Sequence, residues 1–232
     1  MRNMIIASSS TVYGSGYLEY LRPVLLKLYA GVEEILFIPF ARPGGVSHDE
    51  YTEIARKGLS FLNIQVKGIH EFENLKEAVT NAQAIFVGGG NTFVLVNELY
   101  EENLIDLLKD KINKGTPYLG TSAGSNICGI TMQTTNDMPI VKPPSFKTFG
   151  CLSFNINAHF LEADKNSTHL GETRETRIKE YHVYNSTPVL GLQEGSWLEV
   201  NDVIVLGGEL NAFWFDKDFP VKICPPSTVF EV

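Results

Sequence analysis

Length, composition and charge set the first limits on this chain. Its 232 residues are 44% hydrophobic and 20% charged, enough to bury a full core, and we expect one domain over residues 1–232. The formal net charge is -8 without any basic run, so nucleic acid and anionic membranes are excluded as expected partners.

Strand and helix patterns alternate through the first half of the chain. Short apolar runs predict strands at residues 4–7, 35–40, 64–68, 84–87 and 117–119. Apolar residues at helical spacing predict helices at 18–28, 75–82, 93–100 and 104–113. Ser47 and Glu50 form the pattern of a capping box that begins a further helix.

The second half has a different pattern. Residues 131–152 are rich in Thr and Pro and predict a long ordered loop, and 173–184 predict a helix. Residues 189–192, 197–200, 203–206 and 212–215 predict short strands, some of them antiparallel. Together the patterns predict an α/β fold: a doubly wound, mainly parallel sheet with helices on both faces and a few antiparallel strands near the C-terminus.

The segment Gly120-Thr121-Ser122-Ala123-Gly124 lies between a predicted strand and a predicted helix. This is the pattern of a nucleophile elbow, in which a strained turn presents the serine beyond the sheet edge. The amide of Ala123, at the start of the helix, would point to a developing oxyanion. The alternative is a glycine-rich turn with an incidental serine.

A second loop, Gly88-Gly89-Gly90-Asn91, follows the predicted strand 84–87. Ligands gather beyond the carboxyl ends of the strands in such sheets, so an amide of Gly89 or Gly90 is a candidate second oxyanion donor. The alternative is a cradle for a phosphate or a dinucleotide, but the run lacks the full G-x-G-x-x-G spacing.

A serine nucleophile needs a base and an acid that orients the base. Among five histidines, His159 ends an apolar run that could carry it to the sheet edge, although sequence does not show spatial adjacency. Glu194 and Asp137 are the candidate acids, and spacing does not choose between them. Glu194 is slightly preferred, because the carboxyl end of a predicted strand holds a side chain more rigidly than the long loop that carries Asp137.

The arginines and cysteines are the remaining residues that could take part in binding or chemistry. Arg174 and Arg177 share one face of a predicted helix, as a solvated ion-pair face or as a clamp for a substrate carboxylate. Arg174, nearest the helix start, is the candidate, with Arg177 or Arg42 next. Three distant cysteines indicate reduced thiols in the cytoplasm, and no metal-type spacing is present.

Six ordered segments make the chain resemble peptidase E, the aspartyl dipeptidase family of serine peptidases. They are Val87-Gly88-Gly89-Gly90-Asn91-Thr92, Gly120-Thr121-Ser122-Ala123-Gly124-Ser125-Asn126, Thr134-Thr135-Asn136-Asp137-Met138-Pro139, Asn157-Ala158-His159-Phe160, Gly171-Glu172-Thr173-Arg174 and Gly191-Leu192-Gln193-Glu194-Gly195. Two positions depart from the family pattern, Thr121 where an aromatic residue is common and Ala158 where a proline is usual.

The resemblance implies a cytoplasmic enzyme that cuts dipeptides with N-terminal aspartate, without metal or cofactor. It also implies a fold similar to class I glutamine amidotransferases, with Ser122 as nucleophile and His159 as base, while Glu194 and Asp137 both stay open as the acid. Two other functions stay open: hydrolysis of β-aspartyl or cyanophycin-type linkages, and a non-catalytic α/β module that binds an anion. A small Asp-X peptide is the expected partner, and a homodimer is one option for the oligomeric state.

Overall fold

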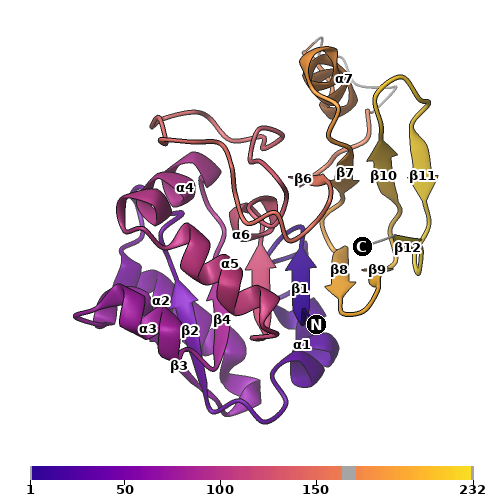
Figure 1. The fold of residues 1–232 in the computed structure, drawn as a ribbon. Helices are drawn as coiled ribbons and strands as arrows, with labels where there is room; N and C mark the ends of the chain where they lie inside the picture. Colours follow the sequence, from indigo (N-terminus) through magenta and orange to yellow (C-terminus); the bar gives the residue numbers. More distant parts are fainter. Residues whose placement is uncertain (1, 164–170, 231–232) are drawn as a thin grey trace.

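Two β-sheets organise the structure, a computed structural model that describes residues 2–163 and 171–230 (Figure 1). The strands are β1 (Met4–Ala7), β2 (Glu34–Ile38), β3 (Gln65–Gly68), β4 (Ala84–Val87), β5 (Tyr118–Thr121), β6 (Asn155–Ala158), β7 (Val189–Leu192), β8 (Trp197–Val200), β9 (Ile204–Gly207), β10 (Ala212–Phe215), β11 (Lys222–Cys224) and β12 (Val229–Phe230). Among these residues, the larger sheet has the order β12-β9-β8-β1-β5-β4-β2-β3 and the smaller one β11-β10-β7-β6.

The helices lie between the strands of the first half and before β7. The α-helices are α1 (Arg22–Leu28), α2 (His48–Leu59), α3 (Leu75–Asn81), α4 (Thr92–Glu101), α5 (Ile105–Asn113), α6 (Ala123–Asn126) and α7 (Arg174–Tyr184). Short 3-10 helices are η1 (Glu19–Leu21), η2 (Ser60–Leu62) and η3 (Ile69–Glu71). The capping box predicted at Ser47 and Glu50 begins α2, with both of its hydrogen bonds present.

The larger sheet buries apolar side chains on both faces. Along β2, Ile35 and Phe37 join one core with α1 and α2, whereas Leu36 and Ile38 join another with α3, α4 and α5. Because successive side chains of a strand point to opposite faces, a strand covered on both sides must be apolar throughout. The predicted doubly wound α/β sheet with helices on both faces is therefore confirmed.

Strand β1 lies where the sheet changes from parallel to antiparallel. It pairs in parallel with β5 and antiparallel with β8, while β5, β4, β2 and β3 continue the parallel part. The carboxyl ends of β1, β4 and β5 therefore open onto one edge of the sheet, where ligands of such folds bind.

The smaller sheet, which the sequence analysis did not predict, adds two more strand ends at this edge. In it β6 and β7 are parallel, with Ala158 opposite Leu192, and β10 pairs antiparallel with both β7 and β11. Figure 1 shows this sheet and α7 beside the larger sheet. Local patterns cannot assign a strand to a sheet, because that depends on partners far away in the sequence.

The long segment between α6 and β6 contains no helix or strand, as predicted for residues 131–152. Its middle is attached to the start of α4 by hydrogen bonds from Asn91 and Thr92. Within the described ranges, none of the helices has the length and apolar character needed to cross a membrane.

Candidate active site

Ser122 occupies the sharp turn between β5 and α6. Its backbone has φ 54° and ψ -108°, a conformation that costs a non-glycine residue free energy and that holds its side chain at the sheet edge. The Ser122 amide donates to the carbonyl oxygen of Ala7 at 3.1 Å, which ties the turn to the end of β1. The local geometry is that of a nucleophile elbow.

His159, directly after β6, connects Ser122 to Glu194. Its Nε2 lies 2.8 Å from Ser122 Oγ and its Nδ1 lies 2.6 Å from Glu194 Oε1. His159 also has a positive φ, 55°, so it is the second residue of this site, after Ser122, with a strained backbone conformation. The histidine and glutamate side chains are 39% and 57% exposed, so this series of hydrogen bonds is open to solvent.

Ser8, which was not among the predicted site residues, holds the backbone next to His159 and Glu194 in place. Its buried hydroxyl accepts a hydrogen bond from the His159 amide at 2.9 Å and donates to the Leu192 carbonyl oxygen at 2.7 Å. Ser8 therefore joins the end of β1 to the two strand ends that precede His159 and Glu194. The only signal in the sequence was its place immediately after a predicted strand.

Asp137 lies at the start of α4 rather than beside His159. Its Oδ2 accepts hydrogen bonds from the Thr92 amide at 2.7 Å, the Thr92 hydroxyl at 2.6 Å and the Thr135 hydroxyl at 2.8 Å. A carboxylate at a helix N-terminus is stabilised by the free amides and the helix dipole. This geometry attaches the long loop to α4.

The glycine loop after β4 lies against the elbow. A Cβ added at Gly89 would stand 2.9 Å from Ser122 Cβ and 3.5 Å from Ser122 Oγ. Gly90 has φ +144°, a region almost restricted to glycine. Among the described residues, the amides of Gly89 and Gly90 have no acceptor, and Ala123 at the start of α6 has a free amide too.

Arg174 is the first residue of α7 and is half-buried. Burial lowers the pKa of its guanidinium from the ordinary value, Arg177 lowers that pKa further and Asp137 opposes the shift. Its charge therefore lies within electrostatic range of the loop that carries Asp137. Arg177 instead forms a loose, exposed ion pair with Glu172, with 3.7 Å between Nε and Oε2.

The cysteine thiols are poor candidates for the nucleophile. Cys128 lies just after α6 and is fully buried, and burial raises its pKa well above the ordinary value. Burial also raises the pKa of Cys151 to about 11. A neutral, inaccessible thiol is a weak nucleophile, so Ser122 is the group at this edge with a base within hydrogen-bonding distance.

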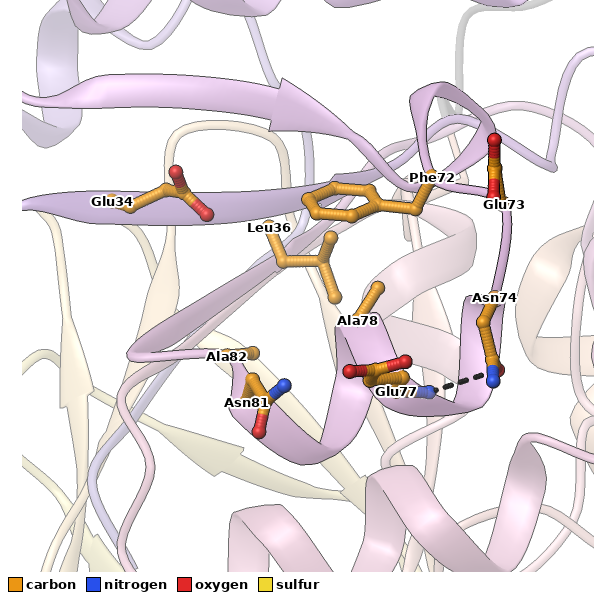
Figure 2. A pocket seen from close by; sticks show the side chains of 9 residues that line it. All are labelled: Glu34, Leu36, Phe72, Glu73, Asn74, Glu77, Ala78, Asn81 and Ala82. Atoms are coloured by element: carbon orange, nitrogen blue, oxygen red, sulfur yellow. Dashed lines mark hydrogen bonds between the residues drawn. The ribbon is translucent and has the colours of Figure 1, made fainter.

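A cavity of about 360 Å³ lies between β2 and α3, away from this site (Figure 2). Its lining runs along α3 from the N-cap residue Asn74 to Ala82 and includes Glu34 at the start of β2. Glu34 pairs with Lys67 at 2.7 Å, and Asn74 caps α3 by accepting from the Glu77 amide. These side chains have structural partners, so the cavity does not compete with the elbow as the candidate active site.

Comparison with known proteins decides the family. The model of peptidase family S51 matches residues 4–205. The chain belongs to peptidase family S51. Among curated relatives, peptidase E of Streptomyces coelicolor is 44% identical over 216 residues, 93% of this chain and 88% of that protein. The probable alpha-aspartyl dipeptidase of Drosophila melanogaster is 43% identical over 221 residues, 94% of this chain and 91% of that protein.

A solved structure agrees with the fold of this family member. The crystal structure of a peptidase from an acI-B1 Actinobacterium superposes with a TM-score of 0.74 at 16% identity, covering 100% of this chain and 97% of that one. At this identity the likeness shows the fold alone. The resemblance inferred from six sequence segments is confirmed at the level of the family.

Proposed function

We propose that this chain is a serine-type dipeptidase that hydrolyses dipeptides with an N-terminal aspartate. The hydrogen bonds from Ser122 to His159 and from His159 to Glu194 carry the proposal, because they connect a nucleophile, a base and an orienting acid in space. The names of the two relatives, peptidase E and probable alpha-aspartyl dipeptidase, support the substrate class.

Acylation begins with proton transfer from Ser122 Oγ to His159 Nε2. The oxygen attacks the carbonyl carbon of the aspartyl residue, and the amides of Ala123 and of Gly89 or Gly90 donate to the resulting oxyanion. The carbon–nitrogen bond then breaks, and the proton on His159 passes to the leaving amine. Glu194 holds the imidazole with Nδ1–H donating and stabilises the imidazolium that forms.

Deacylation repeats these steps with water as the nucleophile. His159 accepts a proton from water, the water oxygen attacks the aspartyl ester, and the ester bond to Ser122 breaks as the proton returns to Oγ. The products are two amino acids, which together contain every atom of the dipeptide and of the water. No step requires a metal or a cofactor.

Arg174 is the proposed cation for the aspartate side chain of the substrate. A carboxylate that leaves water needs a charged partner, and a guanidinium can bind both of its oxygens. Arg174 begins α7, where the free amides of the helix start add to the attraction for an anion. Asp137 on the neighbouring loop acts against the lowering of the Arg174 pKa by burial and by Arg177, so the negative charge of this loop favours the charged guanidinium.

The deciding experiment is hydrolysis of a dipeptide panel in which the first residue varies, using wild type, Ser122→Ala and Ser153→Ala. Asp-Leu should be cleaved faster than Asn-Leu and than its β-linked isomer. Ser122→Ala should lose on the order of 10⁶ in kcat, as for other serine peptidases that lose the nucleophile. Ser153 is an exposed serine outside the site, so its replacement is the matched control and should change nothing.

The alternatives give different results in the same experiment. A hydrolase of β-aspartyl linkages would prefer the β-linked isomer. A module that only binds anions would hydrolyse no dipeptide, and a fluorophosphonate probe would not label its Ser122. Activity of Ser122→Ala within tenfold of wild type would exclude the serine mechanism.

A further inference from the structure

Tyr51, in the first turn of α2, contacts the glycine loop beside the nucleophile. The residue is 2% exposed, and its hydroxyl donates to the carbonyl oxygen of Gly89 at 3.0 Å. Gly89 is the residue whose backbone lies directly against Ser122. A side chain from a helix on one face of the sheet therefore holds the peptide that borders the reacting serine.

The hydrogen bond acts on one particular peptide group. The carbonyl of Gly89 and the amide of Gly90 belong to the same trans peptide, so they point in opposite directions. A donor that holds the carbonyl oxygen on the side of α2 therefore turns the Gly90 amide away from α2. That amide has no acceptor among the described residues, so it is free to donate to a ligand.

The glycine loop needs a contact from outside, because its own residues provide few contacts that could hold the Gly89–Gly90 peptide. Gly90 has φ +144° and no side chain, so no side chain of its own fixes the peptides that flank it. The neighbouring backbone bonds, from Gly88 to Ile38 and from Asn91 to Ala41, hold the two ends of the loop. The Gly89–Gly90 peptide between them is held by Tyr51.

The Tyr51 ring is itself held firmly. It packs edge-on against Phe37 with 5.0 Å between ring centroids, and the Arg42 guanidinium lies 4.9 Å from its centroid on the ring face. A Cβ added at Gly88 would stand 2.6 Å from the hydroxyl oxygen, so glycine at that position leaves room for the ring. A side chain locked by its neighbours can position a second group accurately.

We propose that Tyr51 is a positioning residue for the oxyanion site, fixing the Gly89–Gly90 peptide so that the Gly90 amide points to the developing oxyanion. This rests on the proposed function of Ser122. It differs from a purely structural role, in which the hydroxyl would satisfy a buried carbonyl and affect only stability.

The test compares Tyr51→Phe with Tyr29→Phe. Tyr29 is the matched control, because it is also 2% exposed and its hydroxyl donates to a carbonyl oxygen within β4, that of Ile85, at 3.4 Å. In Asp-Leu hydrolysis, Tyr51→Phe should lower kcat about ten- to a hundredfold, the effect of a misaligned catalytic group, with KM within about twofold of wild type. Tyr29→Phe should leave both constants unchanged.

A structural role alone predicts equal kinetics for the two variants, with differences only in the melting temperature. If kcat of Tyr51→Phe stays within about twofold of that of Tyr29→Phe, the positioning role is wrong. A rise in KM with unchanged kcat overturns it too, because an oxyanion contact stabilises the transition state and not bound substrate.

The rate of Ser122 labelling by a fluorophosphonate separates this inference from the proposed substrate. The phosphonyl oxygen requires the same amide donors, so Tyr51→Phe should slow labelling by a factor similar to its loss in kcat, and Tyr29→Phe should not. If wild type is labelled but hydrolyses no aspartyl dipeptide, the proposed substrate is wrong, and the labelling rates still decide the role of Tyr51.

Gly88→Ala provides a second variant if Tyr51→Phe does not fold. The added Cβ forces the ring away from Gly89 while the hydroxyl is retained. Labelling should slow here as well. Labelling of folded Gly88→Ala at the wild-type rate overturns the proposal.

Discussion

Glu194 and Asp137 differ in what each carboxylate binds. Glu194 accepts from His159 Nδ1 at 2.6 Å, while Asp137 accepts from Thr92 and Thr135 at the start of α4. The geometry agrees with the slight preference for Glu194 as the orienting acid that its place at a strand end gave from the sequence. This preference stays a prediction until the two carboxylates are replaced separately.

We therefore predict opposite phenotypes for two isosteric changes. Glu194→Gln should lower kcat strongly, by up to the roughly 10⁴ measured for a buried orienting acid, and by less if water at this 57% exposed side chain substitutes in part. Asp137→Asn should mainly lower the melting temperature, because it weakens the attachment of the long loop to α4. Steady-state kinetics and thermal unfolding of both variants check this. A large kcat loss in Asp137→Asn alone would contradict the assignment.

Arg174 carries the prediction on specificity. Arg174→Ala should lower kcat/KM for Asp-Leu by about one to two decades, since a hydrogen bond to a charged group contributes roughly 1.5–3 kcal/mol. It should also narrow the preference for Asp-Leu over Asn-Leu. Arg177→Ala is the control, because Arg177 lies on the same helix and pairs loosely with Glu172. If Arg174→Ala keeps the full preference for Asp-Leu over Asn-Leu, another residue binds the substrate carboxylate, and Arg177 and Arg42 are the next candidates.

At the scale of elements, the elbow depends on how closely α6 approaches β4. A Cβ added at Gly124 would lie 2.2 Å from the carbonyl oxygen of Val87, which is backbone and cannot rotate away. The second glycine of Gly-x-Ser-x-Gly is therefore required by packing between a helix and a neighbouring strand. The helix start, and with it the Ala123 amide, is placed by this contact.

Gly124→Ala should destabilise the fold and move the elbow. Overpacking of this kind costs about 1–3 kcal/mol, which lowers the melting temperature of a chain of this size by roughly 2–4 °C for each kcal/mol. Gly44→Ala is the control, because nothing lies within 4 Å of a Cβ added there. Equal melting temperatures for the two variants would show that α6 can shift without cost.

At the scale of the whole molecule, the proposed chemistry needs the protein alone. In the part of the chain that the structure describes, no group of three or more His, Cys, Asp or Glu side chains could hold a metal ion. We predict that dialysis against EDTA leaves kcat and KM for Asp-Leu unchanged. Activity lost with EDTA and restored by added zinc or manganese would contradict a metal-free mechanism.

Much of the fold was predictable because local patterns were strong. Continuous apolar strands such as Ala84–Val87 predict a sheet covered on both faces, and the capping box of Ser47 and Glu50 predicts the start of α2. The strand β6 was missed, because its four residues, Asn155–Ala158, alternate polar and apolar side chains although all are buried. That the chain is one domain stays a prediction.

The α/β class, the family and the elbow segment around Ser122 could be recognised from the sequence. These three features depend on residues close together in the chain. For example, glycines on both sides of a serine indicate a sharp turn between a strand and a helix. Which side chains meet Ser122 depends on how distant segments pack together. His159 and Glu194 reach it from the ends of β6 and β7, and the parallel pairing of these strands brings both ends to the edge where β5 ends. Such pairing is set by contacts between distant segments, so local patterns supported only a slight preference for Glu194 over Asp137, from its place at the carboxyl end of a predicted strand.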